Sequence, residues 1–236
     1  MFGIDPLTIP SLMILAGATS ACPQQEPTKI NIVPRTAQVT YDHRQSLKQI
    51  QEYSTDTVDP YGFHGQTITQ GFMKGQIELR HKIQFGQVKN TGAGLGCVWY
   101  NEIKVTIDID PTIVIAKEMY NDSCMRKAIL GHELKHVRVD REIVNKYAKS
   151  MGEKLMKALQ SRGFSAGPFE LSRMDEIMGK MQRVVSQILE LEYKKLGIER
   201  QERQREVDSL EEYNSVDDKC PAFKERKQKL YSSILE

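Results

Sequence analysis

The sequence His132-Glu133-Leu134-Lys135-His136 lies within a helical pattern that runs from Asp122 or Ser123 to about Gln160. Apolar residues recur at helical spacing before and after it, and both histidines continue the same stripe. These apolar residues are Met125, Ala128, Ile129, Val139, Ile143, Tyr147, Met151 and Leu155. The pattern therefore predicts a long helix whose buried face carries two histidines one turn apart.

The two histidines and the glutamate between them form a His-Glu-x-x-His motif. In this motif, two imidazoles bind one zinc ion and the glutamate activates a water molecule. Buried polar rings need partners, and one metal ion would serve both rings. We therefore expect Zn²⁺ at His132 and His136, with Glu133 accepting the proton of a water that attacks a peptide bond. The alternative is a pair of hydrogen-bonded core histidines.

A zinc hydrolase site of this kind needs a third protein ligand. The candidates are Glu212, Glu211, Asp208 and, on a second long helix, Glu176. Glu212 is favoured, with Tyr213 as a stabiliser of the oxyanion, because this cluster follows the two helices and can fold back on the motif. The alternative is that Asp208 with Glu211, or Ser209 with Glu212, forms a capping box that opens a final helix.

Two further residues are candidates for supporting roles. Asp140 lies eight residues after His132, which is about 12 Å along a helix, so it is expected to orient an imidazole or to form a surface pair with a neighbouring Arg or Lys. His64, in Tyr61-Gly62-Phe63-His64-Gly65, could reach the site, although most lone histidines have other roles.

The composition is that of a soluble globular protein. The chain has 236 residues, of which 39% are hydrophobic and 27% charged, and a formal net charge of +2. This charge is too small to favour nucleic-acid binding, and no basic run is interleaved with aromatic residues. We therefore expect a peptide or protein substrate and no nucleic-acid partner.

The first 22 residues resemble a secretory leader. Residues 6–21 carry no charge and end in small residues before Cys22. Cleavage before Cys22 would give a lipid-anchored protein of the cell envelope, whereas cleavage after Ala18 or Ala21 would give an ordinary exported or periplasmic protein. No Lys or Arg precedes residue 29, which is unusual for a leader. Residues 23–29 form a polar linker to the folded part.

An exported protein can keep disulfides, so the cysteines of this chain are candidates for pairing. If Cys22 is lipidated or removed, Cys97, Cys124 and Cys220 remain. A Cys97–Cys124 bridge is favoured and would contribute roughly 3 kcal/mol in the chain-entropy model. The alternatives are three buried thiols, or four cysteines with Cys22 paired to Cys220.

Residues 30–236 are predicted to form one α+β domain, strand-rich over 30–118 and helical over 122–236. Strand patterns occupy 30–33, 38–41, 75–86, 98–109 and 112–116, with a short helix near 46–53. A second long helix starts near Leu171 and can pack antiparallel to the motif helix. The charged run Glu199 to Glu206 is interpreted as a solvated helical face.

The motif, followed by Asp140, resembles the active-site helix of the zincin superfamily of metallopeptidases. The wider arrangement is similar to an uncharacterised group of bacterial exported proteins assigned as metallopeptidases, over roughly Ile30 to Pro221. That similarity rests on Cys97 opening a strand, Ile103 to Ile109, the motif helix and the late segment Val207 to Tyr213. The zincin resemblance implies an antiparallel or mixed sheet before two long helices. It also implies that strand 98–109 is the edge along which an extended peptide substrate lies.

The leading hypothesis is thus an exported, zinc-dependent, metallopeptidase-like hydrolase. The alternative is a non-catalytic envelope protein that binds or assembles through its helical hairpin. The third-ligand patterns of the metzincin and thermolysin-like branches are missing from this sequence.

Overall fold

The computed structural model describes residues 22–23, 25–53 and 68–235 of the chain. Residues 1–21 of the predicted 22-residue leader and the candidate His64 lie outside these residues, and so does the side chain of Tyr213 within its helix. No helix of the described part is long and apolar enough to cross a membrane.

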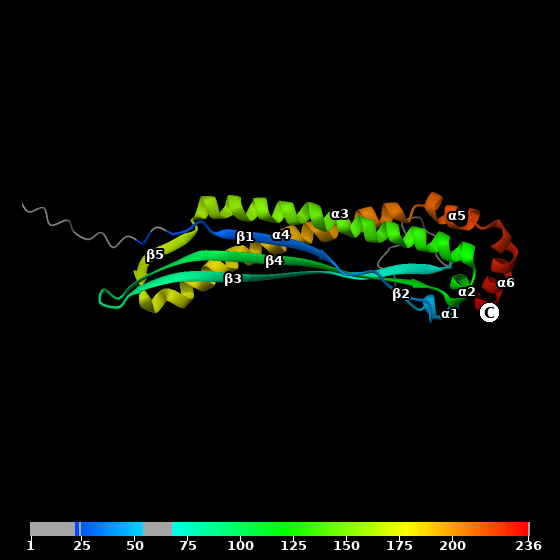
Figure 1. Cartoon of the computed structure of the whole chain (residues 1–236), viewed down its shortest axis with the longest axis horizontal. Helices are drawn as coiled ribbons and strands as arrows, with labels where there is room; N and C mark the ends of the chain where they lie inside the picture. The colour runs from blue at the N-terminus through cyan, green and yellow to red at the C-terminus, as the bar shows by residue number, and fades with distance from the viewer. Residues whose placement is uncertain (1–21, 24, 54–67, 236) are drawn as a thin grey trace, which may run out of the picture.

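The sheet is built around one long central strand, β4 (Leu95–Ile115). β3 (Gly71–Asn90) pairs antiparallel along one side of β4. Three shorter strands follow one another along the other side: β5 (Ser165–Glu170), β1 (Lys29–Thr36) and β2 (Thr40–Asp42). β1 and β2 run parallel to β4 and β5 runs antiparallel, so the sheet is mixed and elongated (Figure 1).

The side chains of β4 alternate between core and solvent. Ile103, Val105, Ile107 and Ile109 are buried on one face, as the alternation in the sequence predicts. Lys104 and Asp110, on the other face, are exposed. The apolar face is covered by the two long helices, so the sheet is packed on one side and solvated on the other.

The helix that carries the motif is α3 (Ser123–Arg162). The carboxylate of Asp122 accepts hydrogen bonds from the backbone N–H groups of Cys124 and Met125, which caps the helix as expected. The helix ends at Gly163, whose positive φ of 97° suits glycine. The predicted helix therefore forms, and it extends two residues beyond Gln160.

The second long helix, α4 (Met174–Val207), follows a turn of 3-10 helix, η1 (Leu171–Arg173). Later residues of α3 contact earlier residues of α4: Lys146 pairs with Glu199, whereas Ser150 bonds Glu192. The two helices are therefore antiparallel, as predicted, and both lie along the length of the sheet (Figure 1).

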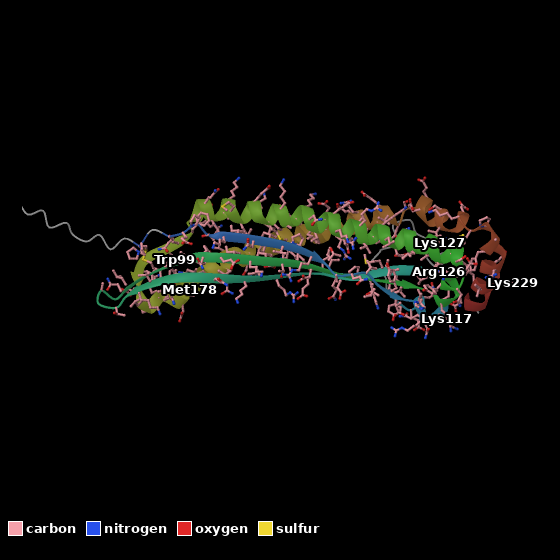
Figure 2. The ribbon with its side chains drawn as sticks, in the orientation of Figure 1. Trp99, Lys117, Arg126, Lys127, Met178 and Lys229 are labelled. Atoms are coloured by element: carbon pink, nitrogen blue, oxygen red, sulfur yellow. A yellow bond between two sulfur atoms is a disulfide. The ribbon has the colours of Figure 1, made fainter. Side chains whose placement is uncertain are left out.

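The remaining elements gather at one end of the molecule (Figure 1). They are α1 (Leu47–Ile50), α2 (Lys117–Tyr120), α5 (Leu210–Asp218), η2 (Pro221–Phe223) and α6 (Lys224–Leu235). Buried residues of this end form a second apolar cluster beside the main core. Figure 2 shows Lys117, Arg126, Lys127 and Lys229 at this end, and Trp99 and Met178 at the opposite end.

The predicted substrate edge is wrong. Strand β4, which contains residues 98–109, is paired on both sides and is the centre of the sheet. Among the described residues, the edges of the sheet are β3 on one side and β5, β1 and β2 on the other, because each of these strands pairs with β4 alone. A central strand and an edge strand can share the same alternating pattern, because alternation reports only which faces are buried.

The favoured disulfide is also wrong, although disulfides do form. The bridges are Cys22–Cys97 and Cys124–Cys220, and they use all four cysteines. Cys97 and Cys124 are close in sequence, but the extended chain from Cys97 to Ile115 spans on the order of 60 Å. The two cysteines therefore lie at opposite ends of the sheet.

Candidate metal centre

Three polar atoms converge at the motif, two from α3 and one from the residue that follows α4. His136 Nε2 lies 3.0 Å from Asp208 Oδ1, and His132 Nε2 lies 3.2 Å from the same oxygen. The two Nε2 atoms are 3.3 Å apart. The described residues therefore contain a His132, His136 and Asp208 group that could hold a metal ion.

The fold explains why these residues meet. His132 and His136 lie on α3 where it passes from one apolar cluster to the other, with Val137 in the second cluster and Val139 in the main core. Asp208 directly follows α4, which runs back along α3 to this point. The two side chains of the motif and Asp208 thus occupy a polar region between two apolar clusters.

The donor set fits a zinc ion. Zinc binds imidazole nitrogen at 2.0–2.1 Å and carboxylate oxygen at similar distances, which places tetrahedral donors about 3.3 Å apart. The three separations of 3.0, 3.2 and 3.3 Å are close to this value. Two imidazoles and one carboxylate also leave a fourth position for water, as in catalytic zinc sites.

The electrostatics of the group show strong mutual stabilisation. Burial would raise the pKa of Asp208, but hydrogen bonds from His132 and His136 and their charges lower it to about 2. Burial would lower the pKa of His136, but its bond to Asp208, the charges of Glu133 and Asp208 and a bond to Gln204 raise it to about 9. A proton on His136 thus stabilises the contact with Asp208, at the position where a metal ion would lie.

Glu133 lies beside the group without belonging to it. Its side chain is buried, and the residue is only 4% exposed. Burial raises the pKa of its carboxyl, while the charges of His136 and His132 and a hydrogen bond from the backbone of Met73 on β3 act to lower it. A separate carboxyl with a raised pKa, next to two imidazoles that could hold a metal ion, has the properties of a general base.

The other candidates for the third ligand lie elsewhere. The carboxylate of the favoured Glu212 accepts a hydrogen bond from Lys135, and its backbone N–H donates to Ser209 Oγ at 3.3 Å, as in the capping alternative. Glu211 is exposed. Glu176 pairs with Arg173 and Lys180 at the start of α4. Among the four candidates, the structure brings Asp208 to the two imidazoles.

Sequence reasoning missed the polar contacts of late α4. Asp140 is fully buried and pairs with Arg200, and Gln204 bonds both Asp140 and His136. Asp140 thus contacts His136 only through Gln204, and its ion pair with Arg200 is buried and joins two helices, unlike the surface pair of the alternative. The spacing of Arg200, Gln204 and Asp208 by four residues places them on one helix face and could have revealed this stripe.

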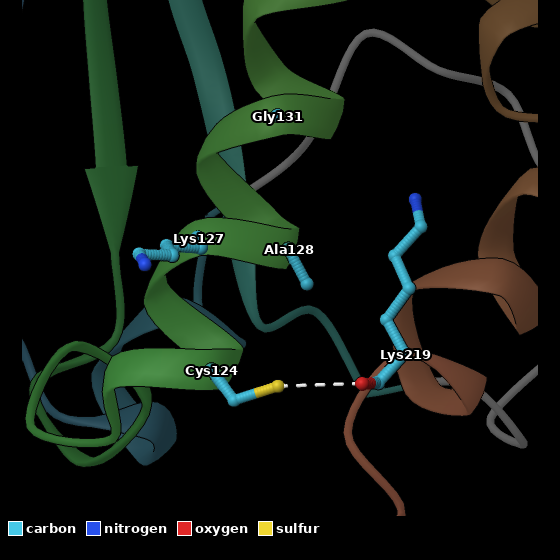
Figure 3. A pocket seen from close by; sticks show the side chains of 5 residues that line it. All are labelled: Cys124, Lys127, Ala128, Gly131 and Lys219. Carbon is cyan, nitrogen blue, oxygen red and sulfur yellow. Dashed lines mark hydrogen bonds between the residues drawn. The ribbon is translucent and has the colours of Figure 1, made fainter.

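A pocket of about 220 Å³ directly precedes His132 along α3. It is lined by Cys124, Lys127, Ala128, Gly131 and Lys219. In Figure 3, the Cys124 side chain points toward Lys219, whereas Lys127 points away from it. The Cys124 sulfur lies 3.3 Å from the Lys219 carbonyl oxygen, but it has no hydrogen to donate because it is bonded to Cys220. The lining includes Gly131, the residue before His132, and none of the three residues that could hold a metal ion.

Comparison of the chain with family models, curated proteins and solved structures finds no match.

Proposed function

We propose that this protein is an exported, zinc-dependent hydrolase of the metallopeptidase type, with His132, His136 and Asp208 as metal ligands. The observation that carries the proposal is the convergence of the Asp208 carboxylate, directly after α4, on the two motif imidazoles, at separations suited to a tetrahedral ion. The two disulfides support an oxidising, extracellular environment.

Each residue has a distinct role in this proposal. A zinc ion would polarise a substrate carbonyl and make a bound water more acidic. His132, His136 and Asp208 would hold the ion and leave one position open. Glu133, whose carboxyl is next to the imidazoles but bonded to neither, would accept the water's proton and later deliver it to the leaving amine.

The first experiment compares metal content and hydrolysis. Purified wild-type protein should contain about one zinc by elemental analysis and should cleave an unfolded protein or a peptide library. Glu133→Gln should keep the zinc and lose hydrolysis, because an amide cannot accept the proton. If Glu133→Gln retains full hydrolysis, or the wild type binds no zinc, the proposal fails. Zinc binding without any hydrolysis would instead support the non-catalytic envelope protein.

A second pair of variants tests the ligand set. Asp208→Asn should weaken zinc binding by at least about 100-fold, since the charged donor is lost. Glu212→Gln is the matched control and should bind zinc as the wild type does, because Glu212 pairs with Lys135. The reverse result would identify Glu212 as the ligand.

A further inference from the structure

We propose that Gln204 is a positioning residue that determines which nitrogen of His136 faces the metal, and that Asp140 and Arg200 fix the orientation of Gln204. This inference rests on the proposed metal site and extends it to the side chains behind the ligands. These side chains control the affinity for the ion.

Asp140 is 0% exposed, and Arg200 binds both of its carboxylate oxygens. Arg200 donates from Nε to Oδ1 at 2.7 Å and from Nη2 to Oδ2 at 3.1 Å. The same Nη2 also contacts the carbonyl oxygen of Gly75 on β3 at 3.4 Å. Because a guanidinium only donates, both oxygens of Asp140 act as acceptors, and their orientation is fixed.

One end of the Gln204 amide lies 2.7 Å from Asp140 Oδ1 and 3.2 Å from the backbone carbonyl oxygen of His136. Two acceptors at that end require the NH₂ group there, so the amide oxygen must face the His136 ring. The hydrogen bonds around Gln204 therefore fix the orientation of its amide group.

Gln204 Oε1 contacts His136 Nδ1, and an amide oxygen can only accept, so Nδ1 carries a hydrogen. In the neutral ring, Nε2 then has a free lone pair, and this atom lies 3.0 Å from Asp208 Oδ1 and 3.3 Å from His132 Nε2. Gln204 thus presents the lone pair of His136 to the metal position.

The two imidazoles of the motif differ in this respect. His132 Nδ1 is buried and has no hydrogen-bond partner within the described residues. At His136, but not at His132, a side chain of the described residues holds the ring through Nδ1. We therefore expect metal affinity to depend strongly on residue 204.

The test measures zinc affinity by competition with a chromophoric chelator. Gln204→Leu has a similar volume but no acceptor, and should weaken zinc binding by about 10- to 100-fold. Gln204→Glu restores an acceptor for Nδ1 beside a second carboxylate, and should recover part of that loss. Arg203→Ala is the control, because Arg203 pairs with the exposed Glu142 and should leave the affinity unchanged.

A role in folding alone would give a different result. Cobalt-loaded Gln204→Leu should show an altered visible absorption spectrum, because the coordination geometry changes, whereas cobalt-loaded Arg203→Ala should match the wild type. Equal zinc affinity and equal spectra for Gln204→Leu and wild type would overturn the inference and leave the zinc site itself intact. Absence of zinc binding in the wild type would instead overturn the proposed function.

One measurement needs no variant at position 204. In the zinc-loaded wild-type protein, long-range ¹⁵N–¹H correlation spectra should show His136 protonated at Nδ1 and bound to the metal through Nε2. Metal binding through Nδ1 would overturn the inference even if Gln204→Leu cannot be purified in folded form.

Discussion

His136 and Asp208 hold each other in their charged forms when no metal is bound. The pKa of His136, about 9, lies above its ordinary 6.5, so its contribution to stability is complete below 6.5 and is lost as pH rises through 9. The pKa of Asp208, about 2, lies below its ordinary 3.8, so its contribution is complete above 3.8 and is lost as pH falls through 2. Metal-free protein should therefore gain most from this pair between pH 4 and 6.5.

This proton must leave when zinc binds, because a protonated nitrogen cannot be a ligand. Zinc loading should thus release about one proton from His136 at pH 7, and the affinity should rise about tenfold per pH unit between 6.5 and 9 from this group. Calorimetric titrations of zinc into metal-free protein, in buffers of different ionisation enthalpy, would count the proton. A pH-independent affinity across this range would contradict the assignment of His136 as a ligand.

At the scale of elements, the great length of β4 and α3 joins the two apolar clusters of the molecule. Both run from the main core into the second apolar cluster, with Ile107 and Leu155 in the first and Ile113 and Met125 in the second. The sequence predicts both elements, because alternation and the 3.6-residue period are local properties. It did not predict the partners of β4, because pairing depends on segments far away in the chain, such as β5.

Packing between α3 and the sheet can be tested with two neighbouring residues. Leu155 is fully buried, so Leu155→Ala should lower the free energy of unfolding by about 2–5 kcal/mol through lost burial and a cavity. Met156, at 38% exposed, points toward solvent, and Met156→Ala should change stability by less than about 1 kcal/mol. Urea unfolding of metal-free protein with intact disulfides would measure both. Equal effects would contradict the observed packing face of α3.

At the scale of the whole molecule, the two disulfides join distant parts of the chain. Cys22–Cys97 attaches the N-terminal segment to the start of β4, and Cys124–Cys220 attaches the segment after α5 to the start of α3. The second bridge closes a loop of 96 residues that contains all of α4 and Asp208. It therefore constrains the part of the chain that contains the proposed third ligand, Asp208.

Mass spectrometry of unreduced peptides should find Cys22 linked to Cys97 and Cys124 linked to Cys220. Cys124→Ser with Cys220→Ser should lower the free energy of unfolding by about 2–5 kcal/mol, since a long loop is no longer closed. A lipid on the Cys22 sulfur would exclude the first bridge, because one sulfur atom cannot carry both bonds. Detection of a Cys97–Cys124 peptide would contradict this fold.

The candidate site shows where local pattern stops being informative. His132, Glu133 and His136 could be assigned from spacing alone, because one helix fixes their relative positions. The choice of Asp208 over Glu212 could not, because both lie after α4 and differ by one helical turn. The position at which α4 ends beside α3 decides between them. Asp208 reaches the imidazoles there, whereas Glu212 reaches Lys135.

The sequence by itself determined the motif helix, its buried face, the alternating central strand and the presence of a second antiparallel helix, since each depends on residues within a few turns of one another. Only the tertiary structure decided the third side chain of the proposed metal site, the hydrogen bonds through Gln204, the edges of the sheet and the cysteine pairing. These depend on contacts between residues about 60 to 125 positions apart, and such contacts are set by the packing register of long elements rather than by any local pattern.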